Sequence, residues 1–546
     1  MDQQGGGRPS AFQTPSLTTA ALIVAAGFLG SRILGLLRSV IIAERFGTSP
    51  ELDAYWVAFR LPDLVFQLLA GATLASAFIP TFAAVRARAG EAAAWRLASS
   101  VLNLVLAATA LFAIAAFLLA PALVPAIAPG LGEEAGRQEE LRALAVRLTR
   151  VMLVSPLLFA VSGMFMGILN ARRHFLMPAL APMFYNLAII LAALVGADVE
   201  ALAVGVVVGA ALHLAVQLPD LRIAGMAYRV VADWRDAAVR EVGTLMAPRV
   251  LGLAATQVNF YFIAIFFASR LEAGAISALT FAWLIVMTPL GVIGMSISTA
   301  AFPTLAEQAA RQDVALARTL ARTLRLIVFL SLPAGVGLFL LAEPTVTALL
   351  QRGAFGAAST DLTLQALRFY ALALVAHAGI EILSRGFYAL SDTRTPVAFA
   401  VLSMLLNLAL AAALVGPLEV QGLALALSLA AVLEFVLLLV FLGRRLPGFL
   451  GDGLGGALGR IAAAASLMAV AVGAVRLGLS GPLGLEVRDG PEAALVLVVC
   501  AALGAVAYMG AAVGLGLPEP RLILTRLPLL RRLVPLAAGD PKEDLV

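Results

Sequence analysis

The sequence predicts an all-α polytopic membrane protein with 14 transmembrane helices, arranged as two six-helix lobes around a central cavity with two extra C-terminal helices. Of its 546 residues, 61% are hydrophobic and only 13% are charged, whereas about 25% of the residues of a soluble domain are charged. The apolar residues form continuous runs of about 20, the length that a helix needs to cross a bilayer. A transmembrane β-barrel would show an alternating pattern instead.

The apolar runs are bounded by charged residues, Gly or Pro, and they define the predicted spans. Several are longer than the roughly 20 residues that cross a bilayer, so these helices must tilt, bend or project beyond it. The polar, Gly-rich start predicts a disordered cytoplasmic tail over 1–16, and a second tail is expected over 516–546. The predicted spans are 17–46, 54–85, 96–127, 141–169, 178–197, 200–218, 243–268, 275–306, 320–342, 362–390, 395–415, 421–443, 459–479 and 492–515.

Charge alternates along the predicted connections. Those that follow even-numbered spans are rich in arginine, and those that follow odd-numbered spans are poorer and often acidic. Because basic residues accumulate on the cytoplasmic side of a membrane, both termini are expected there. The same bias explains the net charge of +5 without a nucleic-acid partner. The arginines after span 6, for example, are Arg222, Arg229, Arg235 and Arg240.

Two short motifs recur six spans apart. Gly71–Arg86 and Gly294–Ala309 each carry a Gly followed nine residues later by a Pro-Thr pair, and Gly167–Pro178 has a weaker counterpart in Gly386–Pro396. Such a repeat predicts two lobes of the same orientation. The alternative is chance similarity between membrane segments rich in Gly, Ala and Pro.

The repeat sets the predicted domains. Spans 1–6 form an N-lobe over 17–218, spans 7–12 form a C-lobe over 243–443, and spans 13 and 14 are an appendage over 459–515. Gly and Pro in spans 2 and 8 could serve as bending points beside a cavity, or they could simply allow close helix packing. The four hinge candidates are Gly71, Pro80, Gly294 and Pro303.

Residues suited to metal binding or nucleophilic catalysis are scarce. Cys500 is the only cysteine, and the three histidines, His174, His213 and His377, show no ligand spacing. The sequence therefore predicts no metal site, no cofactor and no enzymatic reaction.

Three arginines at predicted membrane depth are the strongest functional signal. Arg32 and Arg38 lie in span 1 and Arg60 lies in span 2. A charged side chain at the centre of a membrane helix costs at least about 2.5–3.5 kcal/mol, so we expect these guanidinium groups to line a water-filled cavity. There they would bind phosphate or carboxylate groups. The alternative is that each forms an ion pair that only stabilises the bundle.

Two aspartates near these arginines are candidates for gating. Asp53 and Asp63 could form ion pairs with Arg38 or Arg60 that break when the cavity opens. Asp53 lies at the start of span 2, where it could equally be a helix N-cap, because acidic side chains favour helix N-termini.

Other polar residues lie at apparent membrane depth. Glu381 and Glu434 could couple transport to a proton or cation, although pairing with Arg385 or lining a cleft is favoured. Asn186, Gln257, Asn259 and Asn407 could line a cavity or form hydrogen bonds between helices.

Several motifs resemble those of one family. SRILGLLR…DAYWVAFRLPDL in 31–64 resembles the opening of the MurJ (MviN) lipid II flippases, members of the multidrug/oligosaccharidyl-lipid/polysaccharide exporter superfamily. GILNARRHFLMPALAPMFYN at 167–186, APRVLGLAATQVN at 247–259, QRGAF at 351–355 and GFYALSDTRTP at 386–396 are similar to later segments of that family, in the right order. The resemblance extends over about 15–445.

The resemblance implies a bacterial inner-membrane flippase that moves undecaprenyl-pyrophosphate-linked peptidoglycan precursor (lipid II) to the outer leaflet by alternating access. It also implies functional importance for Arg32, Arg38, Arg60 and Asp53. Membrane lipid is an expected partner, and proteins of cell-wall synthesis are candidates. The coupling ion and energy source stay open.

Span 8 departs from the family pattern. Family members often carry an Arg there, followed by a polar or acidic residue, but this chain has Leu284 and Met287. Either Arg249 compensates or the cargo differs. The alternatives are a flippase for another polyprenyl-linked glycan, such as O-antigen or exopolysaccharide, an ion-coupled exporter of the multidrug type, and a scaffold for cell-wall enzymes that does not transport.

Overall fold

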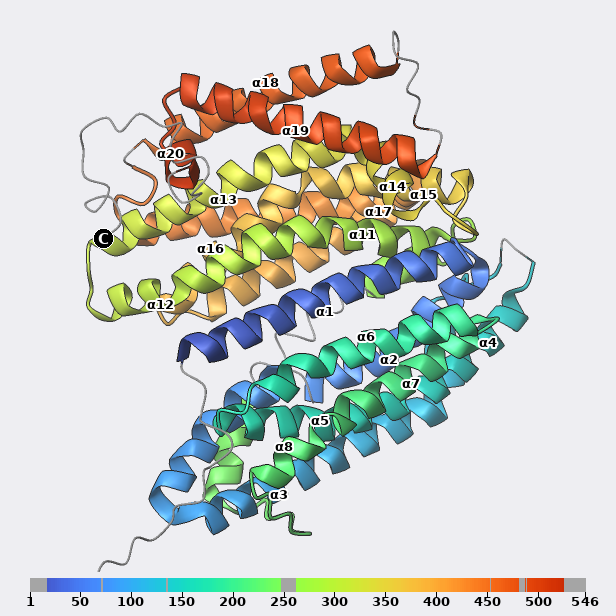
Figure 1. Ribbon diagram of the computed structural model, residues 1–546, viewed down its shortest axis with the longest axis vertical. Coiled ribbons are helices and arrows are strands. Elements are labelled where there is room, and N and C mark those ends of the chain that lie inside the picture. Colours follow the sequence, from blue (N-terminus) through green and yellow to red (C-terminus); the bar gives the residue numbers. More distant parts are fainter. Residues whose placement is uncertain are drawn as a thin grey trace, which may run out of the picture. The chain divides into compact units, whose positions relative to one another are not determined.

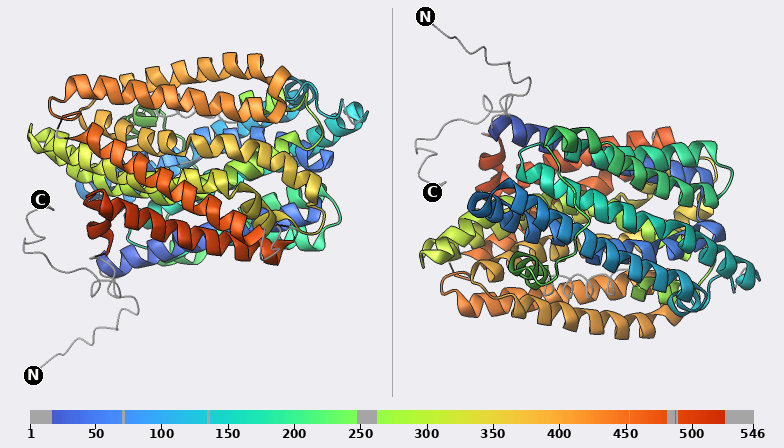
Figure 2. Two further views of the ribbon diagram at one scale, coloured as in Figure 1. Left: turned by 90° about the horizontal axis from the view of Figure 1, so that it is seen from above. Right: turned by 90° about the horizontal axis from the view of Figure 1, so that it is seen from below.

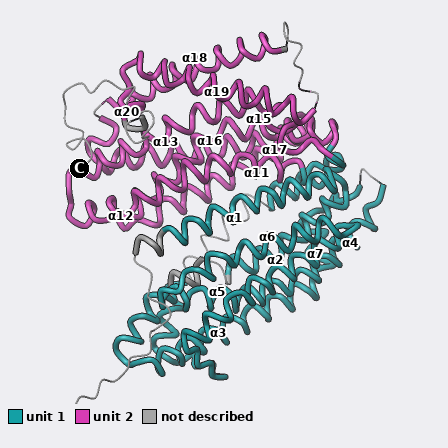
Figure 3. Tube along the Cα trace, viewed as in Figure 1, with its two compact units in different colours: residues 1–277, 353–355 teal, residues 278–352, 356–546 magenta. Residues whose placement is uncertain are grey.

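The computed structural model describes residues 17–69, 72–133, 136–246, 262–451, 453–480, 487 and 489–524, and α-helices dominate these residues, which contain no strand (Figure 1). The chain forms two compact units (Figure 3). Unit 1 comprises residues 1–277 and 353–355, and unit 2 comprises residues 278–352 and 356–546. The predicted boundaries of the two lobes remain a prediction.

Unit 1 is built from long helices that pack side by side (Figures 1 and 2). The most extensive contacts join α1 to α6, α6 to α7, and α3 to α5. Its helices are α1 (Leu17–Phe46), α2 (Pro50–Leu69), α3 (Ala72–Ile127), α4 (Gln138–Met152), α5 (Val154–Ala171), α6 (Leu176–Val195), α7 (Val199–Ala215), α8 (Leu218–Ile223) and α10 (Ile263–Ala268).

Unit 2 contains the C-terminal helices. In it α13 packs against α16 and α18, and α18 lies beside α19. Its elements are α11 (Ala275–Leu290, which begins in unit 1), the π-helix η2 (Gly291–Met295), α12 (Ser296–Ala310), α13 (Ala315–Leu340), α14 (Ala342–Leu350), α15 (Ala357–Leu372), α16 (Leu374–Ala389), α17 (Arg394–Arg445), α18 (Leu454–Ser480), α19 (Gly490–Gly514) and α20 (Glu519–Leu524).

The all-helical membrane architecture is confirmed, but the count of 14 spans is not. Within the described residues, ten helices are long and apolar enough to cross a membrane, or up to 11 when α15 and α16, bent by 45°, count as one span. Three predicted spans are not counted separately. Span 2 falls on α2 and the start of α3, most of span 7 lies outside the described residues, and spans 11 and 12 are continuous in α17.

Helix α17 reverses its direction. A straight helix of its 52 residues would be about 78 Å long, more than twice the roughly 30 Å of the hydrocarbon core. Glu419 breaks it with φ 47° and ψ −126°. The two arms then run side by side, because the Ser403 hydroxyl donates to the Ala430 carbonyl at 3.0 Å and Arg445, at the end of the helix, pairs with Asp392, just before its start.

Asp392 also organises the start of α17. Its carboxylate accepts the backbone N–H groups of Arg394 and Thr395, each at 3.0 Å, and the Thr395 hydroxyl at 2.7 Å. The bonds from Thr395 hold the pKa of the Asp392 carboxyl below its ordinary value. The carboxyl therefore stays charged and satisfies backbone donors that have no partner in the first turn of the helix.

Prolines inside the helices leave carbonyls without their usual partner, because proline lacks the N–H that would bond to the residue four positions earlier. In α2, Pro62 leaves the Ala58 carbonyl in this state, and the Thr149 hydroxyl of α4 lies 3.4 Å from it. In α13, Pro333 does the same to the Phe329 carbonyl, which accepts the Tyr508 hydroxyl of α19 at 2.7 Å. Side chains of neighbouring helices thus complete the backbone bonding.

The C-terminal helices are attached to α13 and α14 at several levels. Arg476 of α18 pairs with Glu343 of α14 and donates to the Leu340 carbonyl at 2.9 Å. Farther along, Arg325 of α13 pairs with Glu519 of α20, which is 1% exposed. Together with the Tyr508 bond, these contacts fix α18–α20 to the rest of unit 2.

We expect Tyr508→Phe to lower the free energy of unfolding by about 1–3 kcal/mol, because it leaves the buried Phe329 carbonyl without a donor. In a Pro333→Ala background the restored N–H can bond to that carbonyl, so Tyr508→Phe should then cost much less. Detergent-induced unfolding of the four proteins of this double-mutant cycle measures both effects. An equal loss in both backgrounds would contradict the explanation.

Candidate functional site

The turn between α1 and α2 sets the position of Asp53. After α1 ends at Phe46, Gly47 adopts φ 59°, and the Ser49 hydroxyl accepts the Leu52 N–H at 3.2 Å. Ser49 therefore caps α2, with Pro50 as the first residue of the helix, where proline is well tolerated. Asp53 follows in the first turn and is buried.

Asp53 binds the N-terminus of a helix that is distant in sequence. Its carboxylate accepts the N–H groups of Gly274 and Ser277, each at 2.8 Å, and the Ser277 hydroxyl at 2.6 Å. These donors lie at the start of α11, which begins at Ala275. Asp53 thus caps a helix other than its own. It accepts hydrogen bonds from N–H groups that have no acceptor within α11, and its carboxylate lies at the positive end of the α11 dipole. The predicted gating role of Asp53 stays a prediction.

Close backbone approaches surround this contact. Gly274 has φ 96°, and a Cβ there would lie 2.3 Å from the Thr48 carbonyl oxygen. A Cβ on Gly47 would lie 2.5 Å from the carbonyl oxygen of Ala354, whose own N–H donates to the Glu44 carbonyl at 2.7 Å. Only glycine fits at these two positions, where the α1–α2 turn meets both segments.

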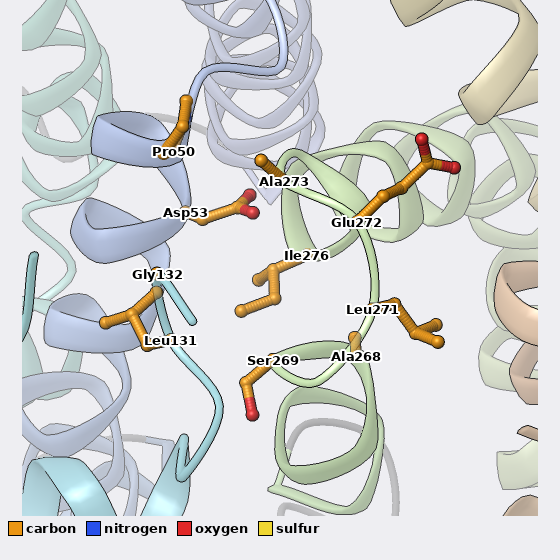
Figure 4. Close-up of a pocket in the computed structure, with 10 residues that line it drawn as sticks. All are labelled: Pro50, Asp53, Leu131, Gly132, Ala268, Ser269, Leu271, Glu272, Ala273 and Ile276. Atoms are coloured by element: carbon orange, nitrogen blue, oxygen red, sulfur yellow. The ribbon is translucent and has the colours of Figure 1, made fainter. Parts of the chain in front are cut away.

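The α3–α4 loop completes the contact. The Gly130 N–H donates to the Ser269 hydroxyl at 3.3 Å, and Arg137, just before α4, pairs with Glu51 at 2.6 Å. We call this meeting of residues 44–53, 128–133, 136–137, 268–277 and 353–355 the Asp53 junction. A small pocket lies within it, and its lining residues include Asp53, Ser269 and Glu272 (Figure 4).

The three candidate arginines have different environments. Arg32 is exposed, with its guanidinium 5.1 Å from the centre of the Phe28 ring. Arg38 is half-buried and Arg60 is buried, and both interact electrostatically with Tyr55. The structure therefore brings Arg38 and Arg60 to one tyrosine and leaves Arg32 on an exposed part of α1.

Two further groups lie near these arginines. Asp63 interacts electrostatically with Arg60 and accepts the Gln67 amide at 2.8 Å. Arg38 also interacts electrostatically with Tyr185 of α6. The Nε atom of Arg38 is enclosed and has no hydrogen-bond partner among the described residues. Buried guanidinium nitrogens are normally bonded, so this N–H is available to a ligand.

The other polar candidates contact neighbouring helices. The Asn186 amide donates to the Ser31 carbonyl of α1 at 3.3 Å, and Glu381 pairs with Arg385 at 2.6 Å in the same helix, α16. Glu434 has a hydrogen bond to Ser403. These contacts agree with the structural alternatives given above, whereas roles in cavity lining or ion coupling stay predictions.

The hinge candidates divide into two groups. Gly294 lies in η2, a π-helical turn between α11 and α12, and a Cβ there would lie 2.9 Å from the Cα of Ala378. It therefore combines an irregular helix turn with close packing, and π-helical turns are common at functional sites. Pro80 and Pro303 are exposed within α3 and α12. Gly71, Arg249 and Asn259 lie outside the described residues.

Sequence reasoning missed the donors that face Asp53. Ser277 and Gly274 stand just before an apolar run, in RLEAGAIS, which is a helix-start signal. It also missed Tyr55 and Tyr185, whose aromatic rings look like ordinary core residues in an apolar helix. In addition, Ser162 and His213 form a buried hydrogen bond of 2.6 Å between α5 and α7 that no motif indicated.

Comparison with known proteins decides the family. The family model described as lipid II flippase MurJ matches residues 42–480, most of the chain. The chain belongs to the lipid II flippase MurJ family. The resemblance found in the sequence motifs is thereby confirmed, and the chain is a multi-span membrane protein of a transporter family.

Relatives in this family match along most of their length. A probable lipid II flippase MurJ of Rhizobium tropici is 34% identical over 440 residues, which cover 79% of this chain and 81% of the relative. The lipid II flippase MurJ of Burkholderia cenocepacia is 31% identical over 439 residues, which cover 78% of this chain and 84% of the relative.

Solved structures show the same fold. Lipid II flippase MurJ in an inward closed conformation matches with a TM-score of 0.74 at 23% identity, covering 90% of this chain and 98% of that structure. A multidrug resistance MATE transporter of the MOP superfamily, in an inward-facing conformation, matches with a TM-score of 0.64 at 15% identity, covering 79% of this chain and 98% of that structure. The fold is therefore the one that MurJ shares with MATE transporters.

We expect Gly274→Ala to weaken the Asp53 junction, because alanine at φ 96° is strained and its Cβ would meet the Thr48 carbonyl. The cost should be about 1–3 kcal/mol. An Ala268→Cys probe in a Cys500→Ala background, buried in the intact junction, should then react faster with a water-soluble maleimide.

Gly243→Ala is the matched control, because no atom lies within 4 Å of a Cβ at that position. Labelling and thermal unfolding equal to those of the unmodified protein in both variants would show that the glycine contact is not needed for closure.

Proposed function

We propose that this protein moves lipid II from the inner to the outer leaflet of the bacterial inner membrane by alternating access. The observation that carries the proposal is that Arg38 and Arg60 both lie close enough to Tyr55 to interact with it electrostatically, with Arg60 buried and Arg38 half-buried. Membership of the lipid II flippase MurJ family supports it, as do the names of the relatives.

The pyrophosphate of an undecaprenyl-linked cargo requires such groups. Its charge cannot enter hydrocarbon alone, and guanidinium groups can replace its water with bidentate, charge-assisted hydrogen bonds. The enclosed Nε of Arg38 supplies one donor. Arg32 would meet the cargo at the open side of the cavity, and Arg249 would be a further cation. No bond in the cargo has to break, so we propose transport without catalysis.

The Asp53 junction would close the cavity on the periplasmic side. With both termini cytoplasmic, as we propose, the α1–α2, α3–α4 and α10–α11 connections all face the periplasm, and these connections form the junction. Breaking the bonds of Asp53 to the start of α11 would open that side. Bending at Gly71, Pro80, Gly294 and Pro303 would accompany the movement of the two lobes.

The C-terminal helices α18 and α19 would hold the polyprenyl tail. They present exposed apolar side chains such as Val470, Leu477 and Val506, and they are fixed to α13 and α14 by Arg476 and Tyr508. The comparisons do not favour a different polyprenyl-linked glycan or a multidrug-type substrate, even though α11 carries Leu284 and Met287.

Complementation of cells depleted of their own lipid II flippase tests the proposal. The unmodified protein should restore growth, and Arg38→Ala and Arg60→Ala should fail at equal membrane levels, because the cargo's pyrophosphate loses a charged partner. Arg38→Lys should restore growth only weakly, since lysine keeps the charge but cannot form the bidentate contact.

Arg88→Ala is the control, because Arg88 is an exposed arginine and its loss changes the net charge equally. It should support growth like the unmodified protein. Growth with every variant would rule out the arginine mechanism, and failure of the well-expressed unmodified protein would argue against lipid II as the cargo.

A further inference from the structure

Residues 224–236 form a strap without helix between α8 and the helical residues 237–246. Side chains of α3 hold its backbone. The Arg229 N–H donates to the Ser99 hydroxyl at 3.1 Å, and the Asn103 amide donates to the Val231 carbonyl at 2.8 Å. The strap therefore lies along α3, and polar side chains of that helix bind it.

This attachment leaves several large side chains of the strap exposed, although the Tyr228 hydroxyl donates to the Asn103 amide oxygen at 2.8 Å. Val230 is 92% exposed, Trp234 is 61% exposed and Tyr228 is 50% exposed. Exposed apolar and aromatic side chains that gather on one segment mark a surface that contacts a protein partner or a membrane. Trp and Tyr are, however, enriched where a membrane protein meets the headgroup layer.

The position of the strap along α3 fits the headgroup layer of a membrane. Counted at 1.5 Å per residue, Asn103 lies about 36 Å from Ile127 at the far end of the helix, and the hydrocarbon core is about 30 Å thick. The exposed apolar side chains of α3 that would face the acyl chains lie between them, from Leu111 to Leu119. The strap thus lies just beyond one edge of the hydrocarbon.

Charges on the strap and its flanks favour contact with anionic groups. The Arg235 guanidinium stacks on Trp234 at 5.0 Å, and the carboxylates of Asp233 and Asp236 accept backbone N–H groups of neighbouring residues. In the described part of the chain, no ion pair with a carboxylate involves the four exposed arginines of this region, Arg222, Arg229, Arg235 and Arg240.

We propose that residues 222–240 form a docking surface for anionic phospholipids. Trp234, Val230 and Tyr228 enter the interface, while Arg229 and Arg235 bind the phosphates of the headgroups. Guanidinium groups suit phosphate, and basic groups beside a membrane favour anionic lipid. The surface is separate from Arg38 and Arg60, so it anchors unit 1 to the bilayer and does not carry cargo.

Tryptophan quenching in nanodiscs tests the proposal on the full chain. Phosphatidylglycerol with dibrominated acyl chains, in a phosphatidylcholine background, should quench the Trp234 fluorescence at least twice as strongly as dibrominated phosphatidylcholine at the same mole fraction. The Trp234 signal is the difference between the unmodified protein and Trp234→Phe. The double variant Arg229→Gln, Arg235→Gln should remove the preference for phosphatidylglycerol.

The matched control is Arg311→Gln with Arg318→Gln, which removes two exposed arginines from unit 2 and should keep the preference. Equal quenching by both lipids in the unmodified protein would overturn the preference for anionic headgroups. A Trp234 signal that aqueous iodide quenches and neither brominated lipid quenches would overturn the membrane contact itself.

Discussion

The structure depends on one constraint, which is that every backbone N–H and carbonyl at membrane depth needs a partner inside the protein. Prolines break this rule locally, and side chains from other helices restore it. The Thr149 hydroxyl approaches the carbonyl that Pro62 frees, and the Tyr508 hydroxyl bonds to the one that Pro333 frees. These two contacts join α2 to α4 and α13 to α19.

The Asp53 junction follows from the same constraint. The start of α11 has N–H groups without intrahelical acceptors, and Asp53 accepts them from the first turn of α2. Because Asp53 caps another helix, its side chain has hydrogen-bond donors although it is almost completely buried. These bonds to the start of α11 are the ones that we propose to break when the periplasmic side opens.

The sequence predicted what is periodic and local. Continuous apolar runs located α1, α6, α7, α18 and α19 to within a few residues, and the gap between the predicted spans 395–415 and 421–443 anticipated the reversal at Glu419 in α17. The sequence alone could not predict contacts between residues that are far apart in the chain. The partner of Asp53 lies 224 positions away, and nothing local distinguishes Ser277 from other serines. The count of 14 spans stays a prediction, because spans 11 and 12 are continuous in α17 and most of span 7 lies outside the described residues.

In the mechanism proposed above, the positions of Asp53 and Arg60 on α2 connect closure with cargo binding. They are seven residues apart, which places them on one face of the helix and about 10.5 Å apart along its axis. Between them α2 is almost completely buried, so it moves as a unit and not residue by residue. Any rotation or shift of α2 that withdraws Asp53 from the start of α11 must also move the Arg60 guanidinium, because both residues lie on α2. The mechanism proposed above therefore needs no separate relay, because one helix carries both the group proposed to close the junction and a group proposed to hold the anion.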